Sequence, residues 1–122
     1  MSEIELDELA VRLGDPALVV LDVRTAAEFE GLAAAPCDPR AGHIPGARHL
    51  DVMRLAGLGS LDEVRALVGE PEGAEIVAYC HSGSRSELAA QVLTAAGYVG
   101  RNYRGSWHEW SRHDDLPAEQ GR

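Results

Sequence analysis

The chain has 122 residues, of which 45% are hydrophobic, which is enough for one globular domain with a core and too many for a disordered chain. Its formal net charge is −9, with 20 acidic residues against 11 basic ones, all arginine, and this balance argues against nucleic acid or an anionic membrane surface as a partner. Met1 to Asp7 lack the basic start and apolar core of a signal peptide, and no apolar run is long enough to span a membrane, so we expect a cytoplasmic location.

Apolar runs of strand length alternate with helical segments along the chain. In chain order we expect a helix from 6 that ends near 14, a buried strand at 18–21, one or two helical turns at 25–30, a loop at 31–46, a short strand at 47–50, a helix from 60 to about 68, a second buried strand at 76–79, a helix from about 84 to 96, a third strand at 98–103 and a short helix at 105–111. Thr25 is a candidate N-cap, and Ser60 with Glu63 has the spacing of a capping box.

This order of elements predicts an α/β fold, with a mostly parallel central sheet and helices on both of its faces. Residues 1–112 should form a single domain, and the charged tail 113–122 should be loosely held. In such sheets the functional sites form at the carboxyl ends of the strands. Cys80 stands at such a position, directly after the second buried strand.

The segment from Cys80 to Arg85 carries the strongest functional signal. It is six residues long, consists mainly of small residues, and joins a buried strand to a helix, so its backbone can curl around the sulfur with its N–H groups pointing inward. The positive end of the helix dipole and the charge of Arg85 favour the reactive thiolate. We therefore predict Cys80 as the nucleophile, with an anion-binding loop made of His81, Ser82, Gly83, Ser84 and Arg85.

Together with two other stretches, this loop resembles the rhodanese-type sulfurtransferases. The first stretch is Leu21-Asp22-Val23-Arg24 with Glu28-Phe29, followed by Gly42-His43-Ile44-Pro45-Gly46-Ala47, and the second is Tyr103-Arg104-Gly105-Ser106-Trp107-His108-Glu109-Trp110. The second is similar to the end of the catalytic domain of thiosulfate and mercaptopyruvate sulfurtransferases. The three motifs stand in family order and the resemblance covers roughly residues 4–110, which implies a rhodanese-like fold.

The resemblance implies a sulfurtransferase that needs no cofactor. Cys80 would take a sulfane sulfur from a small anionic donor (thiosulfate or mercaptopyruvate) or from a persulfide. It would then pass the sulfur to a thiol, to cyanide or to a protein acceptor. This is covalent catalysis in two half-reactions, for which ping-pong kinetics are expected.

The resemblance also assigns supporting roles. Asp22 and Arg24 would fix neighbouring loops, His43 would hold its turn, and Trp107 would wall the pocket or complete the core. Glu28 stands where many relatives carry an arginine that grips the donor anion, so this residue weakens the case for thiosulfate or mercaptopyruvate as the physiological donor. Arg40 would either supply a substitute positive charge or lie exposed on its loop.

Three other functions are alternatives for a chain of this kind. Phosphatases and arsenate reductases of the related fold need five residues between cysteine and arginine, whereas four intervene here. A module that only binds a partner usually lacks the cysteine. A sulfur relay that is active only beside a protein partner stays open.

The remaining cysteine and the histidines give weaker signals. Cys37 is either a resolving cysteine, a second sulfur carrier, or an incidental surface thiol. The five histidines and two cysteines show no metal-type spacing, so we expect no metal.

Overall fold

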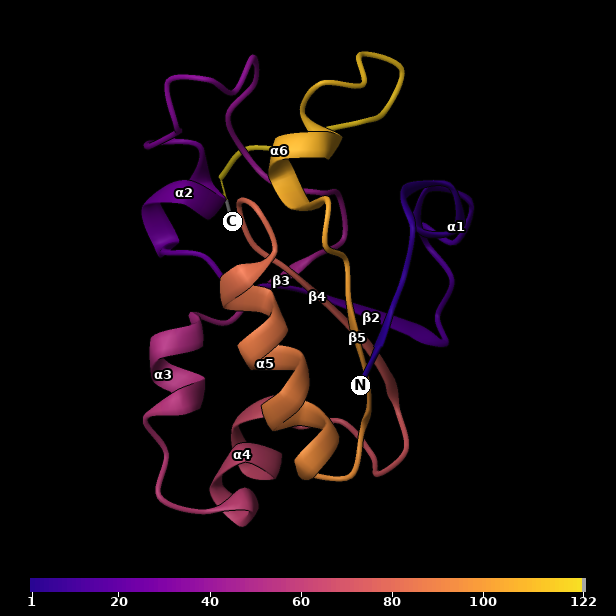
Figure 1. The fold of residues 1–122 in the computed structure, drawn as a ribbon, viewed down its shortest axis with the longest axis vertical. Helices are drawn as coiled ribbons and strands as arrows, with labels where there is room; N and C mark the ends of the chain where they lie inside the picture. Colours follow the sequence, from indigo (N-terminus) through magenta and orange to yellow (C-terminus); the bar gives the residue numbers. More distant parts are fainter. Residues whose placement is uncertain (122) are drawn as a thin grey trace.

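The computed structural model describes residues 1–121, and Figure 1 shows a central sheet with helices packed against it. In chain order the elements are β1 (Ser2–Glu3), α1 (Leu6–Val11), β2 (Leu18–Asp22), α2 (Ala26–Glu30), β3 (Arg48–His49), α3 (Val52–Ala56), α4 (Leu61–Val68), β4 (Glu75–Tyr79), α5 (Ser84–Ala95), β5 (Val99–Asn102) and α6 (Ser106–Trp110). Among these described residues, no helix combines the length and apolar character that crossing a membrane requires.

The sheet confirms the predicted α/β class. Its five strands lie in the order β1-β5-β4-β2-β3, and every neighbouring pair is parallel. The carboxyl ends of β2, β4 and β5 therefore meet at one edge, which brings together Asp22, Asn102 and the loop that follows Tyr79.

The alternation of side chains along β4 divides the core in two. Ile76 and Ala78 belong to one buried cluster, which α3, α4 and α5 cover, whereas Val77 and Tyr79 belong to a second cluster with residues of α1 and α6. Because both faces of β4 are buried, its sequence is a continuous apolar run rather than an alternating one. Cys80 belongs to the same cluster as Ile76 and Ala78, on the side of the sheet that α5 covers.

Sequence patterns missed two short elements. The strand β1 has only two residues, both exposed, at the edge of the sheet, so it carries no apolar run. The helix α3 has five residues and begins at Asp51, whose side chain accepts a hydrogen bond from the backbone of Met53. Both elements are too short for their periodicity to be recognised.

The last described residues contact the rest of the fold at several points. Glu119 pairs with His43 through two backbone hydrogen bonds, and the indole N–H of Trp110 donates to the carbonyl of Pro117. Leu116 packs against the second core cluster. These contacts place residues 113–121 against the loop that precedes β3.

Candidate functional site

Cys80 lies in the turn between β4 and α5, with 1% of its surface exposed. Its Sγ accepts a hydrogen bond of 3.1 Å from the N–H of Gly83 and lies 3.4 Å from the hydroxyl oxygen of Ser86. Gly83 has φ +99°, and a Cβ there would stand 2.7 Å from the carbonyl oxygen of Arg104. Only glycine therefore allows the loop to close on the sulfur.

The surroundings of Cys80 favour its thiolate. Burial raises the pKa of the Cys80 thiol, but hydrogen bonds from the Ser86 hydroxyl and from the backbone N–H groups of Ser86, Gly83 and Ser82 outweigh burial and hold this pKa below its usual value. The Ser86 hydroxyl also donates to the carbonyl of Gly83, 3.2 Å away. Its single proton can therefore turn to the sulfur when the thiol ionises.

The end of β5 and the start of α6 support this loop with two residues that the sequence prediction left out. The Asn102 amide donates to the carbonyl of Gly83 at 3.2 Å, and the Ser106 hydroxyl accepts a hydrogen bond of 3.0 Å from the N–H of Cys80. Ser106 is fully buried and has φ +55°, which is uncommon for a residue with a side chain. Only the position of Asn102 at the end of a strand beside β4 could have signalled this role.

Arg85 is paired rather than free. Its guanidinium binds the carboxylate of Glu28 through two hydrogen bonds of 2.9 and 3.2 Å, and Glu28 also accepts from the backbone N–H and hydroxyl of Thr25 in a capping box. Burial raises the pKa of Glu28, but the bonds from Arg85 and Thr25 outweigh it and lower this pKa to about 2. Arg85, predicted as part of the anion-binding loop, is thus held by the carboxylate of Glu28.

Asp22 and Arg24 form a buried ion pair next to the loop 80–85, which is called the cradle below. Their side chains are 0% and 2% exposed, and the closest nitrogen and oxygen are 2.6 Å apart. The Tyr79 hydroxyl donates to Asp22, and the Arg24 guanidinium donates to the carbonyl of Gly42. The pair thus ties the ends of β2 and β4 to the loop before β3.

His43 and Trp107 lie in the same buried region. Nδ1 of His43 lies 2.7 Å from the carbonyl oxygen of Phe29, and the two rings stack 3.7 Å apart. The Trp107 indole is fully buried in the second core cluster, and its N–H donates to the carbonyl of Arg40. Trp107 therefore completes the core.

Arg40 does not bring a substitute charge to the cradle. Its guanidinium donates to four backbone carbonyls at and after the end of α6, those of Trp110, Ser111, His113 and Leu116. The last carbonyls of a helix are unpaired acceptors that attract a guanidinium, so the charge of Arg40 is engaged at the end of α6.

His81, Ser82 and Ser84 complete the predicted loop. Ser82 and Ser84 are exposed, so their backbone contributes to the cradle more than their hydroxyls do. The Nε2 atom of His81 lies 3.1 Å from a carboxylate oxygen of Asp38.

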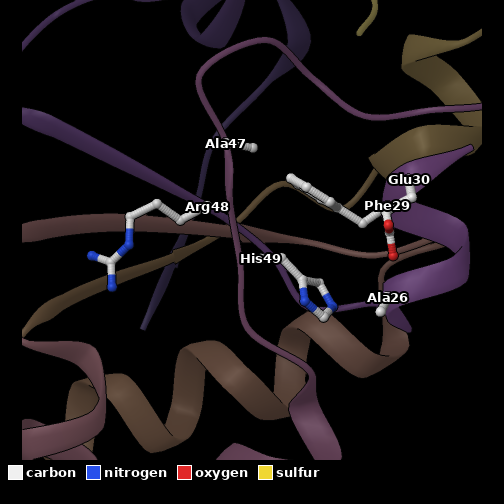
Figure 2. A pocket seen from close by; sticks show the side chains of 6 residues that line it. All are labelled: Ala26, Phe29, Glu30, Ala47, Arg48 and His49. Atoms are coloured by element: carbon white, nitrogen blue, oxygen red, sulfur yellow. The ribbon is translucent and has the colours of Figure 1, made fainter. Parts of the chain in front are cut away.

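A hollow of about 500 Å³ lies elsewhere, between α2 and β3 (Figure 2). It is lined by Ala26, Phe29, Glu30, Ala47, Arg48 and His49. None of these residues belongs to the cradle, so the hollow is not part of the cysteine site.

The sequence is similar to proteins whose names refer to the transfer or carriage of sulfur. The chain is 34% identical to a thiosulfate sulfurtransferase of Azotobacter vinelandii, over 93% of this chain and 44% of the relative. It is 36% identical to the sulfur carrier protein TtuD of Thermus thermophilus, over 93% of this chain and 44% of the relative. The chain thus spans less than half the length of these relatives.

Comparisons of fold and of family pattern agree. A crystal structure of a probable thiosulfate sulfurtransferase superimposes with a TM-score of 0.82 at 38% identity, covering 96% of this chain and 47% of that one. The sequence pattern of the rhodanese-like domain matches residues 5–113, most of the length of the chain. The protein therefore belongs to the rhodanese-like domain family.

Proposed function

We propose that this chain is a sulfurtransferase domain that carries a sulfane sulfur on Cys80. The observation that carries the proposal is the position of the Cys80 sulfur after β4, within hydrogen-bond distance of the Gly83 N–H and the Ser86 hydroxyl. These hydrogen bonds lower the pKa of the thiol. The family and the named activity of a relative support the same chemistry. No cofactor is required for it.

The reaction would proceed in two displacements. The Cys80 thiolate attacks the outer sulfur of the donor, the donor's bond to that sulfur breaks, and the leaving group departs with the electron pair. An acceptor thiolate or cyanide then attacks the outer sulfur of the persulfide, and the electron pair returns to Sγ. The inward N–H groups of the loop stabilise the negative charge on the outer sulfur in between.

The Arg85–Glu28 pair bears on the choice of donor. Because Glu28 neutralises the guanidinium of Arg85, the loop offers an anionic donor only its backbone N–H dipoles and no unpaired positive charge. Thiosulfate and mercaptopyruvate are therefore proposed as weak donors, and a persulfide of a small thiol as a better one.

A glutamine in place of Glu28 is expected to raise kcat/KM for thiosulfate about three- to tenfold, because Arg85 then presents an uncompensated charge at the mouth. Lowering the pH moderately cannot free Arg85 in the way that Glu28→Gln does. In the folded protein the pKa of Glu28 is lowered to about 2, from a value of 4.5 in the unfolded chain. Ionised Glu28 therefore stabilises the fold fully at pH values above 4.5, and this contribution is lost only as the pH falls toward 2.

Steady-state kinetics with thiosulfate and with a persulfide donor check this prediction. The matched control is Glu87→Gln, which removes an exposed carboxylate from the helix that carries Arg85. An unchanged kcat/KM for thiosulfate in Glu28→Gln would show that Arg85 does not act on the donor.

A partner-dependent relay is the second candidate. It is supported by a relative that is named a sulfur carrier protein. In this case the acceptor is a protein thiol, and the net charge of −9 favours a basic partner. A phosphatase or arsenate reductase is less favoured, because four residues rather than five separate Cys80 from Arg85.

We also propose a cytoplasmic location. A nucleophilic thiol must stay reduced, and neither Cys37 nor Cys80 forms a disulfide. A reducing compartment keeps both in that state.

Intact mass measurement of the wild-type protein tests the function. After incubation with thiosulfate, mercaptopyruvate or glutathione persulfide, we expect a gain of one sulfur atom that cyanide removes. Loading without turnover on small acceptors would select the relay. No gain with any donor, on fully reduced protein, would overturn sulfur transfer.

A further inference from the structure

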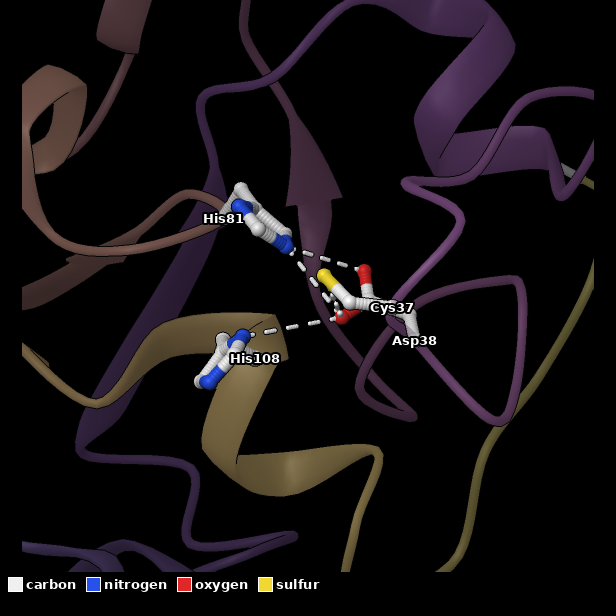
Figure 3. Close-up of side chains that lie close together, drawn as sticks. All are labelled: Cys37, Asp38, His81 and His108. Atoms are coloured by element: carbon white, nitrogen blue, oxygen red, sulfur yellow. Dashed lines mark hydrogen bonds and ion pairs between the residues drawn. The ribbon is translucent and has the colours of Figure 1, made fainter.

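Four side chains from three separate segments of the chain lie close together beside the loop that follows Cys80. Cys37 and Asp38 come from the loop after α2, His81 from the loop after β4, and His108 from α6 (Figure 3). One potential ligand atom from each lies within 4.8 Å of all the others. We propose that Cys37, Asp38, His81 and His108 bind one Zn²⁺ ion.

The donor set matches the chemistry of zinc. One thiolate, two imidazoles and one carboxylate are the ligands of tetrahedral zinc sites, whereas magnesium and calcium prefer sets made only of oxygen. The charges of the Cys37 thiolate and the Asp38 carboxylate balance those of the ion. The net charge of −9 on the protein further favours a cation.

The distances require only a small closure. Zinc–ligand bonds of about 2.0–2.3 Å place tetrahedral ligand atoms about 3.3–3.8 Å apart. His81 Nε2 is already 3.1 Å from Oδ2 of Asp38, and Nδ1 of His108 is 3.8 Å from Oδ1. The remaining movement falls on Cys37 and His108, whose side chains are exposed.

Asp38 is the centre of the cluster. Its side chain is only 1% exposed, so its charge must be balanced by neighbours. Arg112 lies 3.3 Å from Oδ1 and also donates to the carbonyl of Cys37. Oδ1 also lies 3.9 Å from the sulfur of Cys37 and 3.8 Å from Nδ1 of His108, so it is the oxygen that faces the other ligands, and Arg112 holds the carboxylate in orientation.

The site would connect three segments around the cysteine. His81 follows Cys80 directly, and the backbone N–H of His108 already donates to the carbonyl of His81 at 2.9 Å. Zinc at this point would fasten the loop 31–46 to both the cradle and α6. The inference does not depend on sulfur transfer, because none of its ligands is the nucleophile.

Zinc titration of metal-free protein in competition with a chromophoric chelator tests the proposal. We expect one Zn²⁺ per chain, and a rise in Tm of about 10 °C when free zinc exceeds its Kd 100-fold. Cys37→Ser and His108→Ala should each weaken binding by at least about 100-fold. Both side chains are exposed, and circular dichroism verifies that the variants fold.

Two controls separate this site from other zinc binding. Cys80→Ser, which removes the other thiol, and His113→Ala, which removes an exposed histidine just after α6, should both bind zinc as the wild type does. With Co²⁺ as a probe, the wild type and Cys80→Ser should show a thiolate-to-cobalt charge-transfer band that Cys37→Ser lacks. Unchanged zinc affinity in Cys37→Ser and His108→Ala, or loss of binding only in Cys80→Ser, would overturn the proposal.

Discussion

Replacing Cys80 with serine is expected to abolish sulfur loading completely, whichever donor is offered. A serine hydroxyl stays protonated at neutral pH and is a poor nucleophile, whereas hydrogen bonds lower the pKa of the Cys80 thiol and favour its reactive thiolate. Intact mass after incubation with glutathione persulfide measures the effect. Cys37→Ser is the matched control, and it should load as the wild type does when EDTA is present.

The pH dependence of loading in the wild type gives a second check. The rate should rise with pH as the thiolate forms and then level off, with a midpoint below the usual thiol value of 9.0. Loading that persisted in Cys80→Ser and vanished in Cys37→Ser would move the chemistry to the exposed cysteine.

Local patterns predicted most of the framework that holds Cys80. The apolar run that became β4, the small residues after it and the start of α5 are contiguous, so the nucleophile and its loop could be recognised together. The capping box predicted at Ser60 has its first half in the structure, where the Ser60 hydroxyl accepts from the N–H of Glu63. Thr25, predicted as an N-cap, opens α2 with a full capping box.

Contacts between distant residues were not predictable in the same way. Glu28 and Arg85 are 57 positions apart, and only the parallel pairing of β2 with β4 brings the turns after them together. Arg40 reaches carbonyls about 70 positions away, a choice that depends on where α6 ends. Long flexible side chains have several partners within reach, and the sequence does not rank them.

The cluster at Asp38 illustrates the same limit for metal sites. Sequence spacing identifies a metal site when its ligands come in close pairs on one element. Here one adjacent pair is joined by single residues from two other segments, so no motif forms. The convergence arises because α6 packs against the loop that follows β4.

Replacing Asp22 with alanine is expected to lower the free energy of unfolding by about 3–5 kcal/mol, because it leaves the Arg24 charge buried without its partner. The substitution also removes the acceptor of the Tyr79 hydroxyl. Urea unfolding followed by circular dichroism measures the change. Asp62→Ala, which breaks an exposed ion pair with Arg65, is the control and should cost less than about 1 kcal/mol.

A double variant separates the buried charge from the lost contacts. Asp22→Leu with Arg24→Met removes both charges and keeps apolar volume, so it should recover part of the stability that Asp22→Ala loses. Recovery would mean that the cost comes from the unpaired guanidinium. If Asp22→Ala lost less than about 1 kcal/mol, water would have to reach Arg24, and the pair could not be what fixes the ends of β2 and β4 around the cysteine loop.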